Sequence, residues 1–310
     1  MDIANQFVSQ TYGTIELCKD YKAGPFMSEF SSWGASPDLQ LYPDITAHGG
    51  YITSAVLGGY GVYSGTSMAT PNIAGISTLF RQHLVEKYPD LSKVQINDML
   101  YQILMSTATM ARNEDGNPYS PRKQGAVLAD INNSINTDAY MYVKGTNKTK
   151  VELGDDPSKS GNYTLRFNFK NTSSSERKYE MSSYVMTEKV SSDGITVAEK
   201  AYVFSDAKVR IAAAENGISY SGNTVTLAPG ADAQLTVQIV LTSSDKAYLD
   251  ANFKNGMFVE GYLRFTDMSA ANKVDLGIPY MGFYGDWLDA PMFDHSAYDV
   301  SGSKFDESVP

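Results

Sequence analysis

The nine residues Ser-Gly-Thr-Ser-Met-Ala-Thr-Pro-Asn at positions 64–72 have the clearest potential for chemistry. Ser67 stands directly before an apolar helical pattern, with a glycine two residues before it and Pro71 four residues after it. The free backbone N–H groups at a helix start carry a partial positive charge, which suits a nucleophile whose attack creates an oxyanion. Taken alone, the same spacing also fits an ordinary helix-capping serine.

The chain offers no well-placed base for such a serine among its three histidines. His83 follows Ser67 by 16 positions, which is about 24 Å along a helix, whereas a base must lie within about 3 Å. His48 stands in a glycine-rich segment, where we expect a turn or packing role, and His295 is expected to be an exposed linker residue. The proton acceptor that a serine nucleophile needs is therefore missing from this sequence.

The composition indicates a globular protein, because 42% of its 310 residues are hydrophobic and 19% are charged, and this length suits two domains. The net charge of −10 argues against a nucleic-acid-binding surface. A single cysteine, Cys18, excludes an internal disulfide framework. No apolar run reaches the roughly 18 residues of a membrane span. Asp2 and Asn5 stand where a signal peptide needs a basic start and an apolar run, so we predict none.

Residues 1–137 combine short apolar runs with helical periodicity. Ser92 and Gln95 have the spacing of a capping box, which predicts the start of a helix. Pro71 is compatible with the preceding helix, since the first turn needs no backbone donor there. The expected elements are strands over 51–57 and 60–63, and helices over 67–86, from Ser92 onward and over 129–135.

Residues 138–290 instead alternate between apolar and polar residues, with turn residues between the runs. In one such run Leu165, Phe167 and Phe169 share a face. Short alternating strands of this kind predict an antiparallel sandwich, in which two sheets share one core. Strands are expected over 163–170, 225–227, 234–241, 258–265 and 274–280.

Three segments of the first part resemble the subtilisin-like serine proteases, or subtilases. Residues 65–69, Gly-Thr-Ser-Met-Ala, resemble the nucleophile motif of that family. Residues 30–34, Phe-Ser-Ser-Trp-Gly, resemble its Phe-Ser-Ser-x-Gly segment. Residues 43–47, Pro-Asp-Ile-Thr-Ala, with Gly49 resemble its Pro-Asp-Ile-x-Ala-Pro-Gly segment, although His48 stands where many subtilases have proline. The order and spacing of the segments also agree with the family.

A narrower resemblance extends across the second part. Residues 120–126, Ser-Pro-Arg-Lys-Gln-Gly-Ala, resemble the closing segment of the protease domain in lactocepin-type cell-envelope proteinases, with Val127 where a second glycine is usual. Those bacterial enzymes carry a fibronectin type III-like sandwich directly afterwards, and residues 258–262 and 278–283 resemble its late strands. The implied fold is α/β, a partial subtilisin-like parallel sheet with helices, followed by an all-β fibronectin type III-like sandwich.

The resemblance implies three parts. Residues 1–137 would be the C-terminal portion of a subtilase catalytic domain, within which residues 1–27 are compatible with the return from an inserted domain. Residues 138–290 would be the sandwich, and residues 291–310 a linker or the start of a further domain.

The resemblance also assigns roles at the serine. Ser67 would be the nucleophile that forms an acyl-enzyme, and its N–H one half of the oxyanion hole. Thr66 would shape the pocket, and Met68 would pack under the site. The family places its Asp, His and Asn before the serine, yet residues 1–66 contain neither an Asp-x-Gly nor a His-Gly-Thr motif. We therefore expect this chain alone to be inactive.

The expected parent is a secreted or cell-wall-associated serine endopeptidase that cleaves proteins or peptides. The partner expected here is the missing N-terminal catalytic segment or a self-associated copy. The alternative is a non-catalytic surface or scaffolding module that kept the fold and lost the chemistry. A lipase-type hydrolase fits poorly, because residues 65–69 lack the second glycine of Gly-x-Ser-x-Gly.

No metal or cofactor site is predicted, since the sequence has no Cys/His cluster and no EF-hand spacing. Some subtilases bind calcium, but no ligands are assignable in this chain. The sandwich is expected to act as a rigid spacer or, alternatively, as an exosite for large protein substrates.

Overall fold

The computed structural model describes residues 9–11, 14–16, 26–146, 148–192, 196–269 and 273–289. Most of the expected inserted-domain return over 1–27 and all of the expected linker over 291–310 lie outside these residues. Near the N-terminus, β1 (Ser9–Thr11) and β2 (Thr14–Glu16) pair as a short antiparallel hairpin.

Two long helices form the body of the first part. The helix α1 (Thr66–Lys87) has Pro71 in its early turns, and α2 (Lys93–Ser106) begins at the predicted capping box of Ser92 and Gln95. Short helices α3 (Pro121–Gln124) and α4 (Ile131–Asn136) follow. The predicted ranges for α1 and α4 are confirmed to within two residues.

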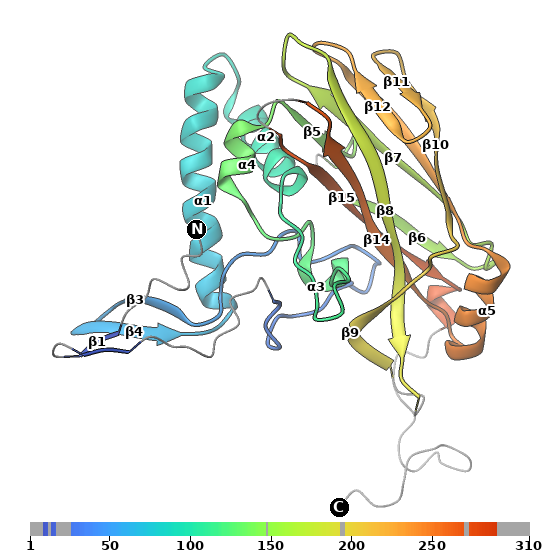
Figure 1. The fold of residues 1–310 in the computed structure, drawn as a ribbon, viewed down its shortest axis with the longest axis horizontal. Coiled ribbons are helices and arrows are strands. Elements are labelled where there is room, and N and C mark those ends of the chain that lie inside the picture. Colours follow the sequence, from blue (N-terminus) through green and yellow to red (C-terminus); the bar gives the residue numbers. More distant parts are fainter. Residues whose placement is uncertain are drawn as a thin grey trace, which may run out of the picture.

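The apolar faces of α1 and α2 meet in a small core. Its buried members are Phe80 and Leu84 from α1, five residues of α2 and Tyr140 from the sandwich. Figure 1 shows α2 lying between α1 and the strand β5 (Ala139–Tyr142), and α2 contacts both of them. Helix α2 therefore joins the first part to the sandwich by apolar packing, and a second small cluster, Ala108 and Val127 with Met186 and Tyr262, does the same.

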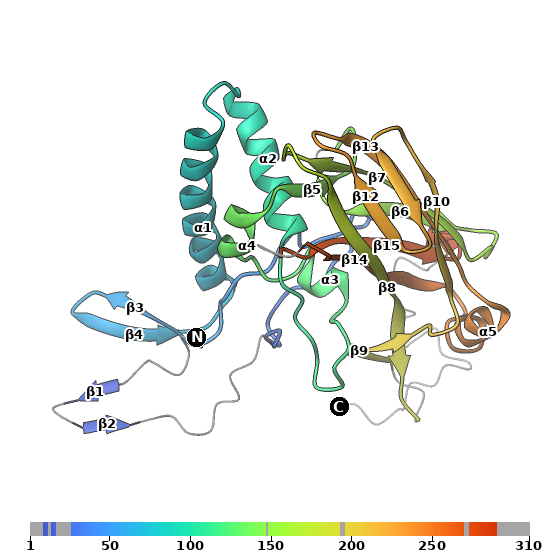
Figure 2. The ribbon, with the colours of Figure 1, turned by 45° about the horizontal axis from the view of Figure 1, so that its top comes forward.

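The predicted strands before α1 form a hairpin, β3 (Ile52–Val56) and β4 (Gly59–Tyr63). Figures 1 and 2 both show it extending away from the rest of the molecule. Its large side chains are exposed, with Leu57 fully so and Tyr60 at 83%. The hairpin thus contributes no buried hydrophobic core among the described residues.

The parallel sheet expected for residues 1–137 is not found in the described part of the chain. Thr46 pairs with Leu128 in a single parallel bridge, and Thr109 pairs with Leu128 in an antiparallel one. The paired segments are too short for a ladder, because α2 ends just before Thr109 and α4 begins just after Leu128. The mixed α and β content is confirmed, whereas the partial parallel sheet is represented among the described residues only by the Thr46–Leu128 bridge.

The second part is built from two sheets. A four-stranded sheet has the order β10-β13-β7-β5, and a seven-stranded sheet has the order β11-β12-β8-β14-β15-β6, with β9 paired to β8. All neighbours are antiparallel except β15 and β6. The strands besides β5 are β6 (Val151–Asp156), β7 (Asn162–Asn171), β8 (Arg177–Val190), β9 (Thr196–Val203), β10 (Lys208–Ala214), β11 (Ile218–Ser221), β12 (Thr224–Leu227), β13 (Asp232–Val240), β14 (Met257–Asp267) and β15 (Leu276–Tyr284).

The two sheets share one core, as the alternating pattern predicted. Leu235, Val237 and Ile239 of β13 are fully buried, and they alternate with half-buried polar residues. Phe169 of β7 packs edge-on against Phe265 of β14, with ring centroids 5.2 Å apart, which ties one sheet to the other. All five predicted strands are present, and α5 (Ser243–Asn252) and a final 3₁₀ turn (Trp287–Asp289) complete this part.

Candidate active site

The segment around Ser67 forms the start of α1, as its spacing predicts. Gly65 precedes the helix, Thr66 is its first residue and Ser67 its second. The side chains of Thr66 and Ser67 are exposed, and Met68 is half-buried. The amides of Met68 and Ala69 are directed to the Gly65 carbonyl, at 3.0 and 3.3 Å. Helix geometry leaves the amides of Thr66 and Ser67 without an intrahelical acceptor, so they can donate to a ligand.

Two glycines shape the turn that carries the serine. Gly65 has a φ of 157°, a backbone conformation that L side chains rarely adopt. Its N–H donates to the Gly49 carbonyl at 2.8 Å. A Cβ on Gly49 would lie 2.7 Å from the Gly65 carbonyl oxygen and 3.0 Å from the Ala69 Cβ. The close approach of these two segments therefore requires glycine at position 49, and the backbone conformation favours glycine at position 65.

Ser64 supports the same turn from the other side. Its hydroxyl accepts a hydrogen bond from the Tyr51 N–H at 2.8 Å. This contact attaches the start of the hairpin β3–β4 to the turn before α1. Sequence reasoning missed the role of Ser64, since a serine beside a glycine gives no signal for a partner 13 residues away.

The described histidines do not meet the serine. His83 lies on α1, where its ring stacks on Phe80 with centroids 6.2 Å apart. His48 is exposed in the segment before Gly49. In the part of the chain that the structure describes, no histidine is hydrogen bonded to the Ser67 hydroxyl, and His295 lies outside that part. The described residues also hold no group of three or more acidic, histidine or cysteine side chains that could bind a metal.

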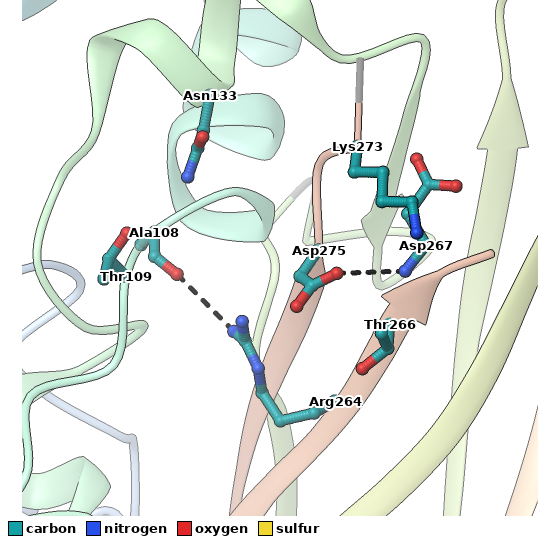
Figure 3. Close-up of a pocket in the computed structure, with 8 residues that line it drawn as sticks. All are labelled: Ala108, Thr109, Asn133, Arg264, Thr266, Asp267, Lys273 and Asp275. Atoms are coloured by element: carbon teal, nitrogen blue, oxygen red, sulfur yellow. Dashed lines mark hydrogen bonds between the residues drawn. The ribbon is translucent and has the colours of Figure 1, made fainter. Parts of the chain in front are cut away.

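A cavity of about 430 Å³ lies elsewhere, between the first part and the sandwich. Figure 3 shows Arg264 of β14 reaching toward the carbonyl of Ala108, to which its Nη1 donates at 3.4 Å. Burial lowers the pKa of the Arg264 guanidinium. The lining residues are Ala108, Thr109, Asn133, Arg264, Thr266, Asp267, Lys273 and Asp275. Thr66, Ser67 and Met68 are not among them, so this cavity is separate from the candidate active site.

Comparison with known families covers most of the chain in two pieces. The subtilase family profile matches residues 19–127, which contain the turn and the start of α1. Residues 19–127 belong to the subtilase family. The Fn3-like domain profile matches residues 151–281, which span the strands from β6 to most of β15. The subtilase segment is thus followed directly by an Fn3-like domain, as the resemblance to lactocepin-type proteinases implied.

Curated relatives share this pair of segments. The chain is 32% identical over 279 residues to the C5a peptidase of Streptococcus pyogenes serotype M3, covering 88% of this chain and 22% of that protein. It is 32% identical over 295 residues to the PI-type proteinase of Lactococcus lactis subsp. cremoris, covering 90% of this chain and 14% of that protein. The PII-type proteinase of the same organism matches to the same extent. The chain therefore spans less than a quarter of the length of these relatives.

The family is that of serine-type endopeptidases. In this subtilase segment the serine of the Gly-Thr-Ser-Met-Ala motif stands at an exposed helix start. Among the described helices none is both long and apolar enough to cross a membrane.

Proposed function

We propose that this chain is the part of a secreted or cell-surface serine endopeptidase that supplies its nucleophile, Ser67. The observation that carries the proposal is the exposed hydroxyl at the second residue of α1, inside the segment that matches the subtilase family. Two amides without intrahelical acceptors lie beside it, and such donors stabilise the oxyanion of acyl transfer. Thr66 would shape the adjoining pocket, and Met68 would pack beneath the serine.

The chemistry would be acyl transfer. The Ser67 oxygen would attack a peptide carbonyl, a histidine would take its proton, and the amine would leave with that proton, which yields an acyl-enzyme that water then hydrolyses. Neither described histidine is placed to take the proton, since His83 is about 24 Å along the helix and His48 forms no hydrogen bond with Ser67 in the described part of the chain. Loss of triad members typically lowers the rate by about 10⁴ to 10⁶. We therefore propose that the chain needs a catalytic segment from elsewhere to cleave proteins or peptides.

The division of the chain is part of the proposal. Residues 1–137 would form the C-terminal portion of the catalytic domain and residues 138–290 the sandwich, a division that the two family matches, 19–127 and 151–281, support.

A labelling experiment tests the assignment. A fluorophosphonate probe is expected to leave this chain unlabelled and to label a longer protein that also carries an aspartate, a histidine and an asparagine of the triad and oxyanion hole. Ser67→Ala should abolish that labelling. Ser77→Ala, on the same helix, should leave it unchanged. Rapid stoichiometric labelling of Ser67 in the chain alone would contradict the need for a second segment.

One competing function is supported by a specific observation. The missing base among the described residues is also what a non-catalytic surface or scaffolding module would have. That module would leave Ser67 unlabelled in the longer protein as well, whereas the endopeptidase would not.

A further inference from the structure

A buried cluster of charges joins the sandwich to the subtilase segment at Arg122. The Arg122 Nε donates to Glu260 of β14 at 2.9 Å, and its Nη2 donates to Glu188 of β8 at 2.7 Å. The guanidinium also lies over the ring of Phe258, 4.1 Å from its centroid. Burial lowers the pKa of Arg122, but Glu260 and Glu188 outweigh it and raise that pKa, so the side chain stays charged.

A second cluster is centred on Lys150, which directly precedes β6. Its side chain is only 3% exposed, and its Nζ lies 3.0 Å from Asp44 Oδ1, an ion pair without hydrogen-bond alignment, and 3.2 Å from Glu152 Oε1. Lys150 also donates to the Leu41 carbonyl, and Glu152 accepts from the Leu41 N–H at 2.8 Å. The sandwich therefore contacts the main chain at Leu41 as well as the charge of Asp44.

The two clusters hold neighbouring pieces of one support. The Arg122 carbonyl accepts from the Gly34 N–H at 2.8 Å. Gly125 lies against residues 43–44 so closely that a Cβ would be 2.4 Å from the Pro43 carbonyl oxygen. The Ala126 N–H then donates to the Asp44 carbonyl at 2.9 Å. Arg122 fixes one side of this pairing, and Lys150 fixes the other.

The same pairing continues to the turn that carries Ser67. The Thr46 N–H donates to the Val127 carbonyl at 3.0 Å, and the Thr46 carbonyl accepts from the Ala129 N–H at 2.9 Å. Three residues later, the Gly49 carbonyl accepts the Gly65 N–H. Main-chain hydrogen bonds, joined by the covalent chain from Thr46 to Gly49, thus lead from both charge clusters to the residue two positions before Ser67.

We propose that Arg122 and Lys150 are positioning residues through which the Fn3-like sandwich fixes the turn that carries Ser67. The sandwich is then part of the support of the active site, and neither a spacer nor a substrate-binding exosite accounts for these contacts. The attachment of the turn to the sandwich follows from the contacts described above, whereas its consequence for catalysis rests on the proposed function of Ser67.

Hydrogen exchange of single amides in the 310-residue chain tests the proposal. In Arg122→Gln and in Lys150→Gln, the amides of Thr46, Ala126 and Gly65 should exchange at least about tenfold faster, because the support opens locally. The β13 amides of Leu235, Val237 and Ile239 should keep their protection. Lys159→Gln is the matched control, since it removes an exposed ion pair with Asp250 on the same sandwich.

Arg122→Lys distinguishes positioning from mere filling of space. It keeps the charge between the two glutamates but loses the planar fork, so it should restore part of the protection that Arg122→Gln loses. If Arg122→Gln unfolds the whole chain, Glu188→Gln replaces it as the test. It keeps the ion pair of Arg122 with Glu260 and should speed exchange only at Thr46, Ala126 and Gly65.

Unchanged exchange at Thr46 and Gly65 in both the Arg122 and Lys150 variants would overturn the proposal. So would equal acceleration in Lys159→Gln. Exchange does not require Ser67 to react, so this test can fail or succeed independently of fluorophosphonate labelling. In a longer protein whose Ser67 is labelled, Arg122→Gln should slow labelling at least about tenfold while Lys159→Gln leaves it unchanged.

Discussion

The subtilase segment and the sandwich differ most in how much apolar surface each buries. Among the residues that the structure describes, the sandwich has a core of 29 buried residues drawn from both sheets. The helices of the subtilase segment share a cluster of eight, one of which, Tyr140, belongs to the sandwich. A domain is stable by itself only when the free energy gained by burying its core exceeds the cost of the conformational entropy lost on folding. From the sizes of the two clusters we expect the sandwich to meet that condition and the subtilase segment to depend on its neighbour.

The largest expected effect is on the sandwich core and spreads to both parts. Phe265→Ala removes a fully buried ring that packs on Phe167 and Phe169, and should cost about 3–5 kcal/mol of unfolding free energy. Because the helices of the subtilase segment pack against the sandwich, the amides of α2 should lose protection from hydrogen exchange together with those of β13. Urea unfolding and native-state hydrogen exchange measure the two quantities.

Phe80→Ala is the matched change in the other region. Phe80 is also fully buried, but in the small helical cluster. It should expose the amides of α1 and α2 and leave those of β13 protected. Symmetrical losses in the two variants would show that the regions support each other equally, contrary to the comparison.

The next effect lies at the boundary between the two regions. The Tyr262 hydroxyl of β14 is buried and lies 3.2 Å from the Gly125 carbonyl oxygen and 3.3 Å from that of Tyr119. Tyr262→Phe removes this donor from the Gly125 carbonyl, whereas the Tyr119 carbonyl keeps its hydrogen bond from Gln124 Nε2 at 2.8 Å. The change should cost about 1–2 kcal/mol in urea unfolding. Tyr220→Phe, at an exposed hydroxyl of the sandwich, is the control and should change little. Equal losses of unfolding free energy in the two variants would mean that the boundary hydroxyl contributes no more to stability than an exposed one.

A smaller effect depends on pH and belongs to the sandwich alone. Burial raises the pKa of Asp232, but hydrogen bonds from Asn168 and Tyr142 and the Lys170 charge outweigh it and lower that pKa. A carboxylate with a lowered folded pKa adds stability above its unfolded pKa of about 3.9, and loses it as the pH falls through the folded value.

Asp232→Asn should therefore destabilise the chain at pH 7, and the difference from the unchanged chain should shrink below about pH 4. Urea unfolding at a series of pH values measures it. A difference that stays constant down to pH 2.5 would mean that Asp232 acts through its shape and not through its charge.

The sequence predicted the sandwich better than the subtilase segment for a physical reason. Alternation such as that of Leu235, Val237 and Ile239 reports burial on one face of a strand, and every predicted strand is present. The parallel sheet was inferred from resemblance alone, and it needs neighbouring strands to extend the pairing of Thr46 with Leu128. Strands with polar or irregular patterns, such as β9, were missed because they give no period.

The site was predictable as a motif and not as an arrangement. The Gly-x-Ser spacing predicted Ser67 at a helix start, where it lies, and its catalytic role stays a prediction. The ion pairs of Arg122 with Glu188 and Glu260 join residues 66 and 138 positions apart. No local pattern can show which distant carboxylates will meet a basic residue, so the support of the turn required coordinates.

The smallest expected effect lies at the tip of the hairpin β3–β4. Leu57 is fully exposed, so Leu57→Ser removes no buried surface and should change the unfolding free energy by less than about 0.5 kcal/mol. Leu84→Ala, at a buried position of α1, is the contrasting control and should cost about 2–5 kcal/mol. A loss above about 1 kcal/mol for Leu57→Ser exceeds what an exposed side chain can contribute. The hairpin would then be packed against another surface in solution, and the weaker of the two regions would bury more than its eight-residue cluster.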